Sequence, residues 1–127
     1  MAAVIYLDTH VVAWLFAGEH RRLSAAGRRA VEEHDLLVSP AVVLELQYLF
    51  ETKRTTTAGT AVIDDLAGRI GLTICDLPFP RVAREAVAHS WTRNPFDRLI
   101  VAQAAIRATA LLTKDRVIRR RYAPAFW

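Results

Sequence analysis

The chain of 127 residues contains a single cysteine, Cys75. One cysteine cannot form an internal disulfide, and it excludes a zinc site built from several thiolates. Long apolar runs are also missing. The apolar start, Met1 to Gly18, has no basic leader segment and is interrupted by Asp8 and His10, so it does not fit a secretion signal. Since no other run approaches the length of a membrane span, we expect a cytoplasmic protein that does not contact membranes.

Internal repeats, low-complexity tracts and Gly/Ser linkers are absent as well, and the loosest segment is the polar stretch 52–57. Because 127 residues with 53% apolar side chains suit one sizeable core, we expect a single domain over residues 1–127. Lysine is scarce: fifteen of the seventeen basic residues are arginine. Arginine binds phosphate bidentately, so the net charge of +4 fits a polyanionic partner, and it fits an ordinary charged surface equally well.

Short apolar runs alternate with helical patterns along the chain. The patterns predict strands at 3–7, 36–38, 72–75 and 110–112, an edge strand in the tail at 125–127, and helices after the first strand and at 24–34, 40–52, 58–69, 82–91, 95–108 and 117–121. Ser39-Pro40 and Asn94-Pro95 are cap-plus-proline helix starts. This alternation predicts an α/β fold with a short central parallel sheet flanked by helices on both faces, a three-layer sandwich.

Three carboxylates lie beside expected strand ends or helix starts. Asp8 follows the first strand and Asp115 follows the fourth, and either residue is also a suitable cap for the next helix. Asp97 comes three residues after Asn94, which is the capping-box position. The positions alone therefore leave a structural role and a ligand role open for each of the three.

Glu45 belongs to the expected helix 40–52, and its neighbours one turn away, Ala41, Val42 and Leu49, are all apolar. We therefore expect Glu45 to point inward. A buried carboxylate without a partner costs several kcal/mol, so it needs a cation. A metal ion and an internal salt bridge to an arginine both remain open as that cation.

The four carboxylates are more informative together. Ligands bind open α/β sheets beyond the carboxyl ends of the strands, where strand order reverses, and Asp8 and Asp115 follow strand ends. If the helices of Glu45 and Asp97 start at the same edge, all four acids converge. Two carboxylates about 4 Å apart repel by roughly 4 kcal/mol at an effective dielectric constant of 20. Such a cluster requires a divalent ion or raised pKa values, and all-oxygen ligation favours Mg²⁺ or Mn²⁺ over zinc.

Four segments match a known family in order and spacing, from about Val4 to Arg116. They are Leu7-Asp8-Thr9-His10 after the first strand, Ser39-Pro40 with Glu45 five residues on, Asn94-Pro95-Phe96-Asp97-Arg98, and Leu111-Leu112-Thr113-Lys114-Asp115. Together they resemble a PIN-domain ribonuclease of the VapC type, the toxin of a type II toxin–antitoxin pair. Pro-Phe-Asp-Arg is the most specific of the segments.

The resemblance implies a PIN-like fold, an acidic pocket that holds Mg²⁺ or Mn²⁺, hydrolysis of RNA by metal-activated water, an antitoxin partner and a homodimer. By position, Asp8, Glu45, Asp97 and Asp115 match the family's catalytic acids. The resemblance implies that Asp8, Asp97 and Asp115 are metal ligands and that Glu45 binds metal or positions the attacking water. Thr113 matches a pocket hydroxyl residue. One departure is Asn94, where many VapC-like sequences carry an acid, and it weakens the case for a second metal.

Other residues leave weaker expectations. The four histidines, His10, His20, His34 and His89, are scattered and fit ordinary surface or packing roles. Arg116, Arg119 and Arg120 form a basic stripe that fits either an RNA backbone or a solvated helix face. The apolar pattern at 14–16 suits a dimer face or the core. Two rival functions are a receiver-like phosphoacceptor domain that binds Mg²⁺ and a nonenzymatic module that binds RNA or a peptide.

Overall fold

A parallel sheet of five strands runs through the centre of the computed structural model, which describes residues 3–127. The strands are short and lie in the order β3-β2-β1-β4-β5. Their bounds are Val4–Leu7 (β1), Asp35–Val38 (β2), Thr73–Ile74 (β3), Ala110–Leu112 (β4) and Ala125–Phe126 (β5). All five expected strands are therefore present, including the edge strand in the tail.

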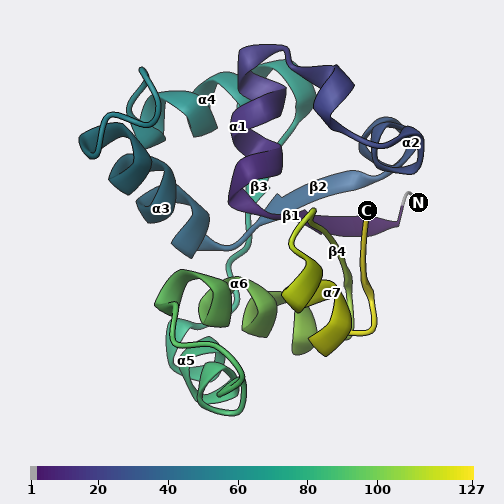
Figure 1. Cartoon of the computed structure of the whole chain (residues 1–127), viewed down its shortest axis with the longest axis vertical. Coiled ribbons are helices and arrows are strands. Elements are labelled where there is room, and N and C mark those ends of the chain that lie inside the picture. The colour runs from purple at the N-terminus through teal and green to yellow at the C-terminus, as the bar shows by residue number, and fades with distance from the viewer. Residues whose placement is uncertain (1–2) are drawn as a thin grey trace.

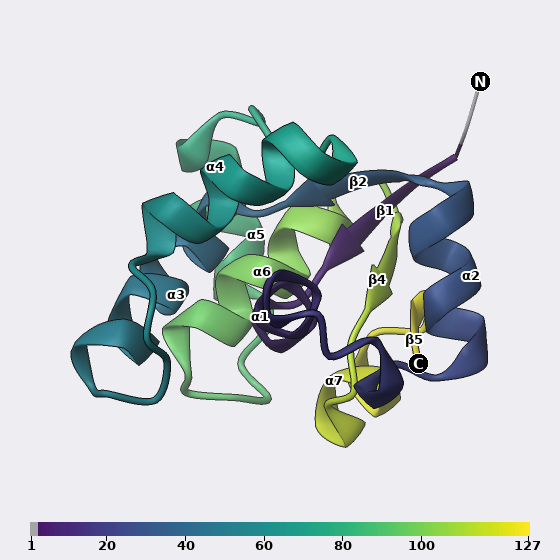
Figure 2. The same cartoon turned by 90° about the horizontal axis from the view of Figure 1, so that it is seen from above.

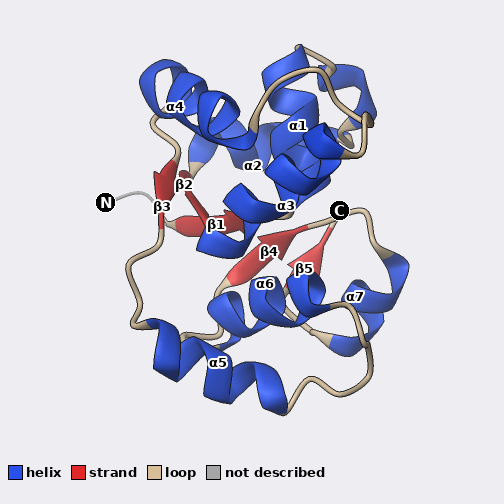
Figure 3. Cartoon of the chain, turned by 90° about the vertical axis from the view of Figure 1, so that its left-hand side faces the viewer, coloured by secondary structure: helices blue, strands red, loops and turns tan. Residues whose placement is uncertain are grey.

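Helices cover both faces of this sheet (Figure 3). The helices are Thr9–Ala17 (α1), Ala25–Glu33 (α2), Pro40–Glu51 (α3), Gly59–Ile70 (α4), Phe79–Val87 (α5), Pro95–Ala105 (α6) and Arg116–Arg121 (α7), with a 3-10 turn at His20–Arg22. Figure 1 shows α1, α2 and α4 on one side of the strands and α5, α6 and α7 on the other. Helix α3 packs against α1, α4 and α6, so it joins the two helical layers. The predicted three-layer α/β sandwich is confirmed.

The strands form the centre of the core. In β1, Ile5, Tyr6 and Leu7 are buried, as are Leu111 and Leu112 in the neighbouring β4. Strands covered by helices on both faces read as continuous apolar runs, which is why these segments were recognisable in the sequence. None of the helices in residues 3–127 is long and apolar enough to cross a membrane.

The order of the strands identifies where a ligand should bind. The chain builds β1, β2 and β3 toward one edge and then adds β4 and β5 on the other side of β1, so the order reverses between β1 and β4. Asp8 follows β1 directly, and its backbone N–H donates to the Leu112 carbonyl at the end of β4 (3.1 Å). Figure 2 looks down α1, which starts at this reversal. The receiver-like alternative does not fit, since that fold has the order 2-1-3-4-5.

Some predicted helix bounds were wrong. The helix expected at 82–91 is α5, which begins at Phe79 and ends at Val87. Pro80 lies in its first turn, where a missing N–H costs no hydrogen bond, so the proline starts the helix rather than preceding it. The helix expected to reach residue 108 stops at Ala105, and Ala108 adopts a left-handed backbone conformation (φ 51°) that ends the helical path. Gly71 ends α4 as expected, also in a left-handed conformation.

Candidate functional site

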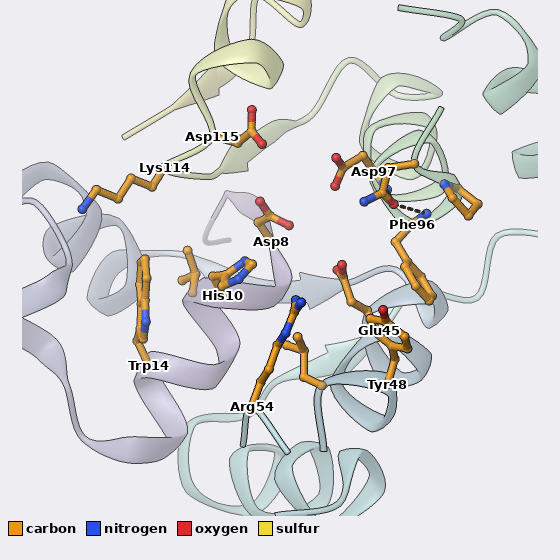
Figure 4. A pocket seen from close by; sticks show the side chains of 14 residues that line it. Asp8, His10, Trp14, Glu45, Tyr48, Arg54, Phe96, Asp97, Lys114 and Asp115 are labelled. Carbon is orange, nitrogen blue, oxygen red and sulfur yellow. Dashed lines mark hydrogen bonds between the residues drawn. The ribbon is translucent and has the colours of Figure 1, made fainter. Parts of the chain in front are cut away.

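One pocket at the carboxyl end of the sheet contains all four predicted acids (Figure 4). This acidic pocket has a volume of about 800 Å³. Asp8 comes from the end of β1, Glu45 from α3, Asp97 from the first turn of α6 and Asp115 from the start of α7. The remaining lining residues are His10, Val11, Trp14, Tyr48, Leu49, Arg54, Asn94, Pro95, Phe96 and Lys114. Four carboxylates that lie far apart in the sequence thus face a common space.

Asp8 is held rigidly at the base of the pocket. Only 7% of the residue is exposed, and its two carboxylate oxygens accept different hydrogen bonds. Oδ1 accepts the backbone N–H of Thr9 (2.8 Å), which caps α1, and Oδ2 accepts the hydroxyl of Thr113 (2.6 Å). Burial raises the pKa of Asp8, and these two hydrogen bonds oppose the shift. The capping role left open by the sequence is therefore real, and it also fixes the carboxylate in the pocket.

Glu45 lies on the side of α3 that faces the pocket, and it is half-buried. Its Oε1 accepts a short hydrogen bond from the hydroxyl of Thr9 (2.5 Å). Burial raises the pKa of Glu45, and the nearby Asp8 adds to the rise. No arginine forms an ion pair with Glu45 in residues 3–127, so the salt-bridge alternative is not supported there.

Asp97 sits in the first turn of α6, where Asn94 is the cap. The Oδ1 atom of Asn94 accepts the backbone N–H groups of Phe96 (2.9 Å) and Asp97 (3.2 Å). The N–H of Asn94 donates to Thr92 instead of Asp97, so Asp97 does not complete a capping box. Its carboxylate is left free for the pocket. Burial, and then the charges of Asp8, Glu45 and Asp115, raise the pKa of Asp97 to about 7.

Asp115 caps α7. Its Oδ1 accepts the backbone N–H groups of Val117 (2.8 Å) and Ile118 (3.0 Å), and its own N–H donates to Thr113 Oγ1 (3.0 Å). Thr113 therefore connects Asp8 to Asp115 through one buried hydroxyl. Thr113 is fully buried and does not itself line the pocket, so its hydroxyl acts from behind the two acids.

The donor chemistry of the pocket fits a hard divalent cation. All four acids offer carboxylate oxygens, the ligands that Mg²⁺ and Mn²⁺ prefer, and the charges of the other three acids add to burial in raising the pKa of Asp97. Within residues 3–127, no group of three His, Cys, Asp or Glu side chains already converges into a closed metal site. The four carboxylates are spread around the pocket instead.

The sequence reasoning missed several residues of the pocket. The sequence favours a surface or packing role for His10, but His10 lines the pocket, and its proximity lowers the pKa values of Asp8 and Glu45 against the effect of burial. Its position two residues after Asp8, in the first turn of α1, could have indicated this. Arg54 and Lys114 also line the pocket. No signal in the sequence indicated Arg54, since it lies in the polar stretch that gave no helical or strand pattern.

Trp14, Leu15 and Phe16 serve mainly the core. Leu15 is buried, and Trp14 and Phe16 pack against the core with part of their surface exposed. The core interpretation is confirmed for Leu15, and a dimer face formed by the exposed parts of Trp14 and Phe16 stays a prediction. The arginine stripe is present as well: Arg116, Arg119 and Arg120 line a shallow hollow on α7.

Comparisons with known proteins agree with this geometry. The family model for the PIN domain matches residues 5–124. The chain is 36% identical to ribonuclease VapC22 of Mycobacterium tuberculosis, an alignment that covers 94% of this chain and 93% of that protein. The family-model match spans all four acidic residues.

Solved structures share the fold at lower sequence identity. The toxin–antitoxin complex from Klebsiella pneumoniae contains a chain that matches with a TM-score of 0.67 at 16% identity, covering 97% of this chain and 96% of that one. A chain of VapBC2 from Rickettsia felis, solved with a DNA fragment from its promoter, matches with a TM-score of 0.64, also at 16% identity and with the same coverage. At this identity the likeness concerns the fold.

Proposed function

Because the chain belongs to the PIN-domain family, we propose that it is a metal-dependent endoribonuclease, the toxin of a toxin–antitoxin pair. The observation that carries the metal dependence is that Asp8, Glu45, Asp97 and Asp115 all line one pocket beside the strand-order reversal. The ribonuclease activity is supported by the similarity to a ribonuclease along almost the whole chain.

Asp8, Asp97 and Asp115 are the proposed ligands of Mg²⁺ or Mn²⁺, and Glu45 is a further ligand or orients the attacking water. A divalent ion held there would supply Lewis acidity for hydrolysis and offset charge on the phosphate oxygens. The residues of the chain prepare the site for it. Thr113 and the Thr9 N–H fix the orientation of Asp8, and the Thr9 hydroxyl fixes that of Glu45. The Asn94 side-chain oxygen is occupied by the helix cap, which leaves it poorly placed to add a ligand.

A cleavage assay tests this function. The purified protein should cleave single-stranded RNA in Mg²⁺ or Mn²⁺, and EDTA should stop the reaction. Asp8→Asn should abolish cleavage while leaving the melting temperature unchanged or slightly higher, because one of several repelling charges is removed. Asp64→Asn, an exposed acid on α4 outside the pocket, is the matched control and should stay active. Full activity in excess EDTA would show that cleavage does not depend on a metal ion. No cleavage with either metal ion would leave the nonenzymatic RNA- or peptide-binding alternative.

We also propose a cognate antitoxin as the physiological partner and a homodimer as the assembled form, both from the family relationship. The exposed apolar side chains Leu44 and Tyr48 lie one turn apart on α3 and offer surface for a dimer contact. Sedimentation of the wild-type protein and of Leu44→Glu distinguishes a dimer through this face from a monomer.

A further inference from the structure

Arg54 lies where the acidic pocket meets a second cavity. This neighbouring cavity has a volume of about 540 Å³ and is bounded by α1, the end of α3 and the segment 54–57. Arg54 lines both spaces, together with His10, Trp14 and Leu49. Figure 4 shows its side chain reaching into the acidic pocket near His10 and Glu45, on the side away from Asp115.

The backbone that carries Arg54 is fixed by the end of α3. The N–H of Lys53 donates to the Phe50 carbonyl (3.0 Å), and the N–H of Arg54 donates to the Leu49 carbonyl (2.8 Å). This pair of bonds is a Schellman motif, and Lys53 takes the left-handed conformation that the motif requires (φ 63°). The turn reverses the chain at α3 and directs residue 54 back toward the pocket. Arg54 is thus placed by an ordered turn, although its side chain is exposed.

Among the cationic side chains that line the acidic pocket, Arg54 is the one without a partner in residues 3–127. Lys114 is occupied, since its Nζ lies 5.9 Å from the ring centroids of both Trp14 and Trp127. Arg54 forms neither an ion pair nor a cation–π contact within the same residues. Its guanidinium group therefore faces the pocket with its donors available.

An RNA strand entering this pocket meets four carboxylates, so the protein needs positive charge beside them. Guanidinium groups present a planar fork of donors that matches two phosphate oxygens. We propose that Arg54 is a substrate-binding residue that holds the RNA phosphate seated in the acidic pocket. This inference rests on the proposed ribonuclease function. Arg54 would then bind a phosphate group directly, in addition to the role of the four acids in holding the metal ion.

The test compares Arg54→Gln and Arg54→Lys with Lys53→Gln, which removes a charge one position earlier and outside both cavities. Affinity for a fluorescent single-stranded RNA is measured by anisotropy in the Asp8→Asn background with Mg²⁺, over a range of salt concentrations. Arg54→Gln should raise Kd about tenfold and reduce the slope of log affinity against log salt by about 0.7. Arg54→Lys should keep the slope but lose affinity, because it loses the bidentate contact. Lys53→Gln should change Kd less than about twofold.

Cleavage kinetics supply the second readout, measured with the Arg54 and Lys53 substitutions in the otherwise wild-type protein, where Asp8 is intact. Arg54→Gln should raise KM for RNA with a smaller change in kcat, and its melting temperature should match that of the wild-type protein. An unchanged Kd and salt slope would overturn the proposal. So would faster cleavage by Arg54→Gln, which would make Arg54 an internal plug of the site. If the wild-type protein cleaves no RNA, the proposed function fails, while the binding comparison still decides the role of Arg54.

Discussion

Asp115 uses its two carboxylate oxygens differently. Oδ1 accepts both N–H bonds of the α7 cap, and Oδ2 accepts no hydrogen bond from residues 3–127. A carboxylate has about four lone-pair sites, so one group can cap a helix and still bind a cation. Capping also restricts the rotamer of the side chain, which prepares the second oxygen for a ligand. Asp115 can therefore cap α7 and bind a metal ion at the same time.

Asp97 should make the metal-free protein less stable as pH rises from about 4 to 7. Its pKa is raised to about 7 in the folded state, whereas an aspartate in an unfolded chain titrates near 3.9. Between these values the folded state keeps a proton that the unfolded state has lost, so the free energy of unfolding falls with increasing pH. The stabilising contribution is complete below about pH 4 and lost above about pH 7. Urea denaturation in EDTA across this range measures it.

Asp97→Asn should reduce this pH dependence without abolishing it, because the pKa values of Asp8 and Glu45 are raised as well, and Asp64→Asn should leave it unchanged. Mg²⁺ should stabilise the wild-type protein more at about pH 7.5 than at about pH 5, because protons and the metal ion compete for the same carboxylates. A pH dependence that is the same in Asp97→Asn and the wild-type protein would contradict the raised pKa of Asp97.

The contact between α3 and α4 depends on a glycine. A Cβ added to Gly59 would lie 2.6 Å from the carbonyl oxygen of Val43 and 2.8 Å from the backbone nitrogen of Gln47, both in α3. Backbone atoms of a packed helix cannot yield as a flexible side chain can. Gly59→Ala should therefore destabilise the protein by about 1–3 kcal/mol, as overpacked sites do.

Gly68, in the same helix, is the matched control. A Cβ there meets no atom within 4 Å, so Gly68→Ala should stabilise the protein by about 0.5–1 kcal/mol through helix propensity alone. Chemical denaturation of both variants gives the comparison. Equal effects of the two substitutions would show that α3 and α4 do not pack as closely as described.

Helix α7 combines a pocket acid with a basic face. Asp115 caps it, and Arg116, Arg119 and Arg120 line the hollow on its surface. Charge reversal at Arg119 and Arg120 should weaken RNA binding and reduce the salt slope by roughly 0.7–0.9 for each lost phosphate contact, with kcat spared. Arg121→Glu is the control, since Arg121 is exposed on the same helix but does not line the hollow. If Arg121→Glu weakened RNA binding as much as charge reversal at Arg119 or Arg120, the three arginines would form a solvated face that attracts RNA only through its overall charge.

For the whole molecule, the sequence predicted the layers and the four acids because both depend on local patterns. Buried parallel strands are continuous apolar runs, and Asp8 and Asp115 follow strand ends directly. Arg54 could not be predicted in this way. Its place in the pocket depends on a tertiary arrangement, the turn at Lys53 that brings the end of α3 beside α1. The predicted bounds of α5 and α6 were wrong for a related reason, since the residue at which a helix ends depends on the detailed backbone turn.

The lining of the two adjoining cavities indicates how the proposed antitoxin would inhibit cleavage of RNA. The acidic pocket attracts a cationic side chain, and arginine remains charged when buried and pairs bidentately with carboxylates. The neighbouring cavity offers an apolar wall formed by Ala13, Phe16, Leu46, Leu49 and Val62. We expect an antitoxin segment to place an arginine near Asp8 and Asp97 and apolar side chains against this wall.

Such an arginine should compete with the metal ion, since both occupy the same negative potential. Raising Mg²⁺ should therefore weaken inhibition of the complex, and an antitoxin with this arginine changed to alanine should still bind but inhibit poorly. The measurement is RNA cleavage by the co-purified complex across a Mg²⁺ titration, with a matched titration of the free protein as control. A complex as active as the free protein would refute the mechanism. Inhibition that does not depend on Mg²⁺ would instead mean that the partner blocks the path of the RNA while leaving the carboxylates free.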